Sequence, residues 1–132
     1  MTGKLKPLWH VLLLAIWINL AETVRWVLYS KSQFEAHLQG MGLGLPNTPL
    51  NGILWMVWGT TIAFVVYMVA QKFTLLQTTI ITWLAGFVLV WIALWNCAVL
   101  PLGILPVVIP LSLVTMFIAV LIARKLQPRP SA

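Results

Sequence analysis

Residues Leu50–Ala70 read LNGILWMVWGTTIAFVVYMVA, an apolar run that contains no charged residue. About 20 residues of this kind are the length that an α-helix needs to cross the ~30 Å hydrocarbon core of a bilayer. Three further runs of similar length and composition fill most of the remaining chain, at Leu8–Tyr29, Leu76–Leu100 and Gly103–Ala123. The sequence therefore predicts four transmembrane helices.

The composition of the whole chain supports a membrane bundle as its single domain. The 132 residues are 61% hydrophobic and 8% charged, whereas a soluble domain carries roughly 25% charged residues. Backbone groups in lipid must pair internally, so a spanning segment is a helix or part of a closed barrel. Runs such as Ile62–Val66 do not alternate in polarity as barrel strands do. We therefore predict an all-α membrane protein over residues 1–132, an antiparallel bundle of four helices in the lipid bilayer.

The distribution of basic residues predicts how the bundle is oriented. Four spans place both termini on one side, and this side would carry six of the basic residues: Lys4, Lys6, Lys72, Arg124, Lys125 and Arg129. The loops of the opposite side carry only Lys31, since Arg25 falls inside the first span. Cytoplasmic loops are enriched in Lys and Arg. We therefore expect cytoplasmic termini in a multi-pass protein of a cell membrane, a bacterial inner membrane. The net charge of +6 has its source here, and we predict no nucleic-acid partner.

The segments between the spans are predicted as one long and two short connections. Residues 30–49 form the long outer loop, because Gly40, Gly42, Gly44, Pro46 and Pro49 end regular structure. Within it, residues 32–38 can form a short interfacial helix capped by Ser32. The other links are short, so the last three helices should pack as antiparallel neighbours. Residues 126–132 are expected to form a loose tail.

The polar residues of the first span are its main departure from an apolar helix. Asn19, Glu22, Thr23 and Arg25 all fall inside it. Ionisable groups at this depth cost roughly 2.5–3.5 kcal/mol each and mark functional sites by default. Arg25 is three residues from Glu22, a spacing at which the two side chains can pair. The alternative is a purely structural pair, with Arg25 reaching toward the outer interface.

Tryptophans are concentrated in the outer half of the predicted bundle. Trp58 and Trp91 should lie deeper than an interfacial aromatic belt. A carboxylate among tryptophan faces can hold an organic cation or an amphipathic molecule. We therefore predict an outer-half ligand site made by Asn19, Glu22, Arg25, Trp58, Trp91 and Asn96. The alternative is that these tryptophans serve only the lipid interface.

Prolines mark the last span, which contains Pro106 and Pro110. Prolines inside a helix remove backbone hydrogen bonds and kink it. Ser112 and Thr115 follow, and their hydroxyl groups are predicted to bond carbonyls of the preceding turn. We interpret all four residues as shaping helix packing.

Metal binding, cofactor binding and catalysis have no support in the sequence. His10 and His37 lie on opposite sides of the first span and cannot share a metal, and Cys97 is the only cysteine. No phosphate-binding loop or nucleophile–base pair is visible. We predict no metal and no cofactor; enzyme activity stays undecided, and the sequence leans against it.

The pair Ala21-Glu22 resembles one feature of the small multidrug-resistance transporters, whose essential glutamate follows an alanine in the first of four helices. The resemblance covers these two residues alone. Loops are very short in that family, whereas residues 30–49 form a long loop here, and Arg25 would compete with a cationic substrate. The chain is therefore not assigned to that family.

Two functions remain open from the sequence. In the first, the protein binds or transports a small cationic or amphipathic ligand at Glu22 and Arg25. In the second, it is an accessory or assembly subunit that packs against itself, as a homo-oligomer, or against a larger membrane complex.

Overall fold

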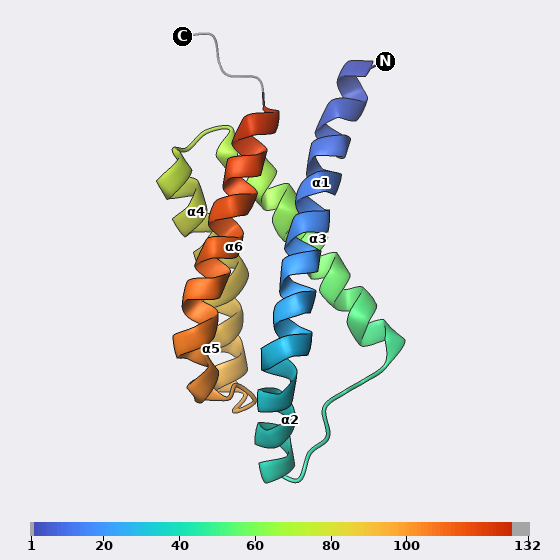
Figure 1. Ribbon diagram of the computed structural model, residues 1–132, viewed down its shortest axis with the longest axis vertical. Helices are drawn as coiled ribbons and strands as arrows, with labels where there is room; N and C mark the ends of the chain where they lie inside the picture. Colours follow the sequence, from blue (N-terminus) through green and yellow to red (C-terminus); the bar gives the residue numbers. More distant parts are fainter. Residues whose placement is uncertain (1, 128–132) are drawn as a thin grey trace.

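The computed structural model describes residues 2–127, and within them every regular element is helical (Figure 1). The elements are α1 (Thr2–Arg25), η1 (Trp26–Ser30), α2 (Lys31–Gly40), α3 (Pro49–Ala70), α4 (Leu75–Trp83), η2 (Leu84–Val88), α5 (Leu89–Asn96), η3 (Leu102–Ile104) and α6 (Leu105–Leu126). They form four helical units that are long and apolar enough to cross a membrane: Lys6–Gly40, Pro49–Ala70, Leu75–Asn96 and Leu102–Leu126. The predicted number of such helices is confirmed.

Successive helical units run in alternating directions along the molecule (Figure 1). The ends of α1 and α6 that lead to the termini share one end of the molecule with the turn between α3 and α4, and we call it the terminal end. The opposite end, which we call the loop end, holds α2, the connection of residues 41–48 and the turn between α5 and η3. Helix α3 crosses the others at a steep angle, and its first turns lie apart from the rest at the loop end.

The first helix is longer than the sequence predicted. Residues 31–40, expected as part of an outer loop, form α2, which continues from α1 through the π-helical turn η1 without a break. Ser32 is not a helix cap, because its hydroxyl group donates to the Tyr29 carbonyl from within the helix at 3.1 Å. Neither proline nor glycine interrupts the chain between Arg25 and Gly40, so nothing ends the helix before Gly40. The true loop is the segment of residues 41–48.

The main hydrophobic core lies between the halves of the helices nearer the terminal end. α6 packs against α1, α3 and α4, and it contributes Met116, Ala119, Val120 and Ala123 to the core. α1 and α3 contribute their own buried residues, which are Leu14, Ala15, Ile18, Ile62, Ala63, Val66 and Ala70. Alanines at these contacts allow close backbone approach, as is usual between membrane helices.

Phe87 of η2 also belongs to this core, and Trp58 and Trp91 pack against it, but the parts of three helices nearer the loop end add no fully buried residue of their own. No residue is buried in α1 and η1 from Asn19 to Tyr29, in α3 from Pro49 to Trp58, or anywhere in α5. A second, small cluster of Leu100, Ile104 and Val108 fixes the start of α6 against Tyr29 and Phe34. The bundle is therefore tightly packed at the terminal end and loosely packed toward the loop end.

The turn that ends α5 has a regular capping geometry. The Val99 amide donates to the Leu94 carbonyl at 3.0 Å and the Ala98 amide to the Trp95 carbonyl at 2.9 Å, which is the Schellman pattern. Ala98 takes the left-handed position with φ 60°. Its carbonyl oxygen lies 2.9 Å from His37 Nε2. This contact joins the turn to α2.

The prolines of α6 have different roles. Pro106 lies in the first turn of the helix, where no intrahelical hydrogen bond is lost, and Pro110 lies inside it. The predicted backbonding after them is confirmed. Ser112 Oγ donates to the Ile109 carbonyl and Thr115 Oγ1 to the Leu111 carbonyl, both at 3.0 Å.

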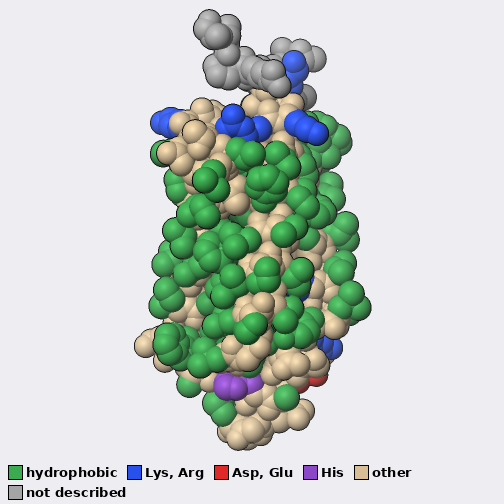
Figure 2. Space-filling model, turned by 60° about the vertical axis from the view of Figure 1, so that its left-hand side comes forward, with side chains coloured by type: hydrophobic (Ala, Val, Ile, Leu, Met, Phe, Trp, Pro, Cys, Tyr) green, Lys and Arg blue, Asp and Glu red, His purple; other side chains and the backbone are tan. Residues whose placement is uncertain are grey.

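The surface is divided into bands along the long axis (Figure 2). On the face shown, a broad band of hydrophobic side chains is bordered at the terminal end by several Lys and Arg side chains, and at the loop end by His and Glu side chains with a Lys or Arg side chain beside the Glu. Exposed basic residues of the described terminal end are Lys6, Lys72, Arg124 and Lys125. Arg129 and most of the predicted tail, residues 128–132, lie outside the described residues. Of the tail, Leu126 is the last residue of α6.

Candidate functional site

Glu22 and Arg25 form an ion pair on the last turn of α1. The Arg25 Nη2 group donates to Glu22 Oε2 across a spacing of three residues. The Arg25 side chain is 18% exposed and the Glu22 side chain is 14% exposed. The pair lies at the edge of the main core, beside Phe87. Seven residues separate Glu22 from the end of the apolar run at Tyr29, which is about 10 Å along a helix axis.

The ion pair leaves several of its own atoms without a hydrogen-bond partner. Within residues 2–127, Glu22 Oε1, Arg25 Nε and Arg25 Nη1 are buried and unpaired. A buried polar group without a partner costs its full desolvation penalty, about 1–3 kcal/mol and more for a charged group. One carboxylate oxygen and two guanidinium nitrogens therefore lack a hydrogen-bond partner within the described residues.

Phe87 supports the guanidinium group from the opposite helix. The Arg25 Cζ atom lies 5.5 Å from the centre of the Phe87 ring, within the range of a cation–π interaction. Phe87 belongs to η2 and is only 2% exposed. Sequence reasoning missed this residue. The signal was its spacing of four from both Trp83 and Trp91, which places the three rings on one helix face.

Phe87 also joins the two tryptophans predicted from the sequence. Its ring centre lies 5.3 Å from that of Trp58 in an edge-to-face arrangement and 6.0 Å from that of Trp91. Both distances are typical of favourable aromatic pairs. Trp55 extends the contact from Trp58, and Trp83 extends it from Trp91, with ring centres 5.8 and 6.1 Å apart. We call these five residues the aromatic cluster.

Asn19 lies one turn before Glu22, at the point where α1 and α3 separate. Its side-chain amide lies against Gly59, and Gly59 is the first buried residue of α3. Asn19 therefore stands at the boundary between the packed and loosely packed parts. Asn96, the last of the six predicted residues, is exposed at the end of α5. Of the six, Glu22 and Arg25 form the ion pair and Trp58 and Trp91 contact Phe87, whereas Asn19 lies against Gly59 and Asn96 is not part of these contacts.

Two π-helical turns border the site. η1 begins at Trp26, immediately after Arg25, and η2 contains Phe87. π-helical turns are rare and occur frequently at functional sites. Here one follows the residue that carries the guanidinium group, and the other carries the ring beneath it.

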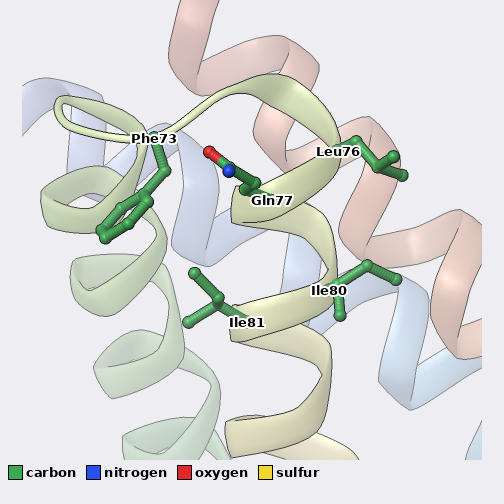
Figure 3. Close-up of a pocket in the computed structure, with 5 residues that line it drawn as sticks. All are labelled: Phe73, Leu76, Gln77, Ile80 and Ile81. Carbon is green, nitrogen blue, oxygen red and sulfur yellow. The ribbon is translucent and has the colours of Figure 1, made fainter.

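Two hollows of the surface lie away from this site. One, of about 330 Å³, is lined by Phe73, Leu76, Gln77, Ile80 and Ile81, mainly from the first turns of α4 (Figure 3). The second is lined by His37, Trp95, Ala98, Leu100 and Leu102 at the loop end. Neither includes a residue of the predicted site. Among the described residues no group of His, Cys, Asp and Glu side chains could hold a metal ion.

Comparison of the chain with family models, with curated proteins and with solved structures gave no match.

Proposed function

We propose that the chain is a multi-pass membrane protein with cytoplasmic termini that binds a small, charged amphipathic ligand between α1, α3 and α5. The ligand would reach the Glu22–Arg25 pair from the outer side. The observation that carries this proposal is the set of unpaired polar atoms, Glu22 Oε1, Arg25 Nε and Arg25 Nη1, beside helices that contribute no buried residue there.

The membrane location is supported by the four apolar helical units and the charge distribution. Exposed Lys6, Lys72, Arg124 and Lys125 share one end of the molecule, and Lys and Arg are enriched on the cytoplasmic side of membrane proteins. The opposite end would face outward. α2 and residues 41–48 then lie beyond the hydrocarbon core, because its ~30 Å thickness accommodates only about 20 of the residues in the first helical unit.

A ligand site explains the ion pair better than a structural role does. A pair that only holds the helices together would be expected to satisfy its donors and acceptors within the bundle. Here Arg25 contacts Phe87 with its face, and two of its nitrogens remain unpaired. Aromatic side chains around the pair offer apolar contacts for the rest of an amphipathic molecule. Movement of the ligand across the membrane would further require the core at the terminal end to open.

The test compares the only two acidic residues of the chain. Glu22→Gln removes the charge of the site, whereas Glu35→Gln removes a carboxylate that is 42% exposed and pairs with Lys31 at 3.9 Å. Purified protein in mild detergent would be heated with organic cations, amphipathic acids and lipids. A ligand that binds only the folded state stabilises it by RT ln(1 + L/Kd) at free ligand concentration L, so the melting temperature rises with ligand concentration. We expect such a rise for the wild type and Glu35→Gln, and none for Glu22→Gln.

A different result would favour an assembly role. If no compound stabilises the wild type and Glu22→Gln only lowers stability, the pair is structural and the proposal is wrong. Co-purification of a second membrane subunit, lost in Glu22→Gln but kept in Glu35→Gln, would identify the chain as an accessory subunit instead.

A further inference from the structure

The unpaired atoms of the site specify the head group of its ligand. We propose that this head is a zwitterion, with an N–H-bearing ammonium that binds Glu22 and an adjacent oxyanion that binds Arg25. This inference rests on the ligand site proposed above and narrows the class of molecule that the site takes.

The first reason is the set of donors and acceptors that the site leaves unpaired. Glu22 Oε1 is an acceptor without a donor, while Arg25 Nε and Nη1 are donors without an acceptor. A purely cationic head would satisfy the carboxylate and leave both guanidinium nitrogens unpaired. A purely anionic head would satisfy the guanidinium group and leave the carboxylate oxygen unpaired. Only a head that carries both a donor and acceptors satisfies all three atoms.

Charge balance gives the second reason. The Glu22–Arg25 pair is neutral as a unit and lies among apolar and aromatic side chains. An ion that enters such a site brings a net charge into a medium of low polarity, which is costly. A zwitterion adds no net charge, and each of its ends lies next to a charge of opposite sign. Charge-assisted hydrogen bonds of this kind are stronger than neutral ones.

The loose packing of the bundle provides the place for an apolar chain. The side chains of Ile53, Leu54 and Trp55 are more than half exposed on the part of α3 that leaves the core. A chain attached to the head can lie against this part of α3 while the head lies at the ion pair. The chemistry fits a lipid with a phosphoethanolamine head, and it also fits a free molecule in which an ammonium group stands beside a phosphate or carboxylate.

The experiment compares three short-chain lipids with identical acyl chains in detergent-purified protein. Dihexanoyl-phosphatidylethanolamine carries an ammonium with N–H donors and a phosphate. The phosphatidylcholine keeps the charges but has no N–H donor, and the phosphatidylglycerol has no cation. Glycerophosphoethanolamine, which lacks acyl chains, is a fourth probe that separates a lipid from a free zwitterion. The readout is the shift of the melting temperature with concentration, which gives an apparent Kd.

We expect the ethanolamine lipid to bind at least about tenfold more tightly than either other lipid, since choline offers Glu22 no N–H donor and glycerol offers it only a neutral hydroxyl group. Glu22→Gln should abolish the difference between ethanolamine and choline heads. Arg25→Gln should weaken binding of every phosphate-containing probe. Glu35→Gln and Lys31→Gln, which alter the exposed pair of α2, should behave like the wild type. If a single substitution prevents folding, the double variant Glu22→Gln/Arg25→Gln, which leaves no unpaired charge at the site, is used instead. It should bind none of the probes selectively.

The outcomes separate this inference from the proposed function. The zwitterion is refuted if the three lipids bind equally, or if phosphatidylglycerol or an organic cation binds more tightly than the ethanolamine lipid. If that binding is lost in Glu22→Gln, the ligand site itself is retained. No stabilisation of the wild type by any probe, including the organic cations, refutes both. If glycerophosphoethanolamine binds as tightly as the ethanolamine lipid, the zwitterionic head is supported and the ligand is a free molecule without acyl chains.

Discussion

The side-chain amide of Asn19 lies so close to Gly59 that a β-carbon at position 59 would stand 2.7 Å from Asn19 Cγ. On the loop-end side of this contact, α1 and η1 bury no residue up to Tyr29, and α3 buries none between Pro49 and Trp58. The absence of a side chain at Gly59 thus sets the place where the two helices separate.

Gly59→Ala is expected to destabilise the protein by about 1–3 kcal/mol, the usual cost of an added carbon in a filled contact. Gly52→Ala is the matched control in the same helix, because a β-carbon there has no atom within 4 Å. It should be neutral or stabilising by about 0.5–1 kcal/mol, since alanine favours helix over glycine. Thermal unfolding in detergent would compare them. Equal effects of the two substitutions would show that Asn19 and Gly59 are not in contact.

The contact between Arg25 and Phe87 should appear as an energetic coupling. Phe87→Leu removes the ring under the guanidinium group, which lies 5.5 Å away, and Arg25→Gln removes the charge. A double-mutant cycle on unfolding free energy should give a coupling of about 0.5–2 kcal/mol. The same cycle between Phe87→Leu and Lys31→Gln should give none. A zero coupling in the first cycle would contradict the cation–π contact.

A hydrogen bond between α4 and α6 is expected to contribute to the packing of the bundle. Trp83 Nε1 donates to Ser112 Oγ at 2.9 Å, and Ser112 is completely buried. Trp83→Phe should therefore cost about 0.5–1.5 kcal/mol of unfolding free energy. Trp95→Phe, in an exposed side chain of the same helical unit, should cost less than about 0.5 kcal/mol. Equal losses in thermal unfolding would rule out a role for this hydrogen bond.

Ala98 offers a substitution that should increase stability. Its φ of 60° is unfavourable for a residue with a β-carbon, and glycine is the usual residue at this position of a Schellman motif. Ala98→Gly should raise the unfolding free energy by about 0.5–1 kcal/mol. Ala93→Gly, inside α5, should lower it by about 1 kcal/mol. A decrease in both variants would mean that residue 98 does not adopt the left-handed conformation.

Deletion of Val27 tests the connection between α1 and α2. A π-helical turn holds one residue more than an α-helical turn, so removing one of the five residues of η1 should restore an α-helix and rotate α2 by about 100°. His37 would then leave the Ala98 carbonyl oxygen, now 2.9 Å from its Nε2 atom. Hydrogen exchange of residues 31–40 should become faster in the deletion variant. The control Val27→Ala should leave this exchange unchanged, because the side chain of Val27 is exposed. Unchanged exchange in the deletion variant would contradict this role of His37.

The sequence identified the four apolar helices because their length and hydropathy are dictated by the chain itself. It predicted a short interfacial helix at residues 32–38 inside a loop, but it did not predict that α2 continues from the first helix, although no glycine or proline precedes Gly40 in that stretch. The π-helical turns were also missed. Hydropathy does not distinguish hydrogen bonds that span four residues from those that span five.

At the site, the sequence identified Glu22 and Arg25 because ionisable residues stand out in an apolar run. Phe87 was overlooked for the opposite reason, since phenylalanine in an apolar helix has no compositional contrast. Its importance depends on tertiary contacts with Arg25, Trp58 and Trp91. The unpaired atoms of the ion pair could not be predicted either, because satisfaction of hydrogen bonds depends on every neighbouring helix.

The continuous helix from α1 through η1 to α2 connects the ion pair directly to the helix at the loop end. Arg25 is its last residue before the π-helical turn, and His37 lies on the far side of that turn. If the turn winds or unwinds when Arg25 changes its partner, α2 turns about its own axis outside the packed part of the bundle. A change of partner at a buried guanidinium group would then become a rotation of α2 at the loop end of the molecule.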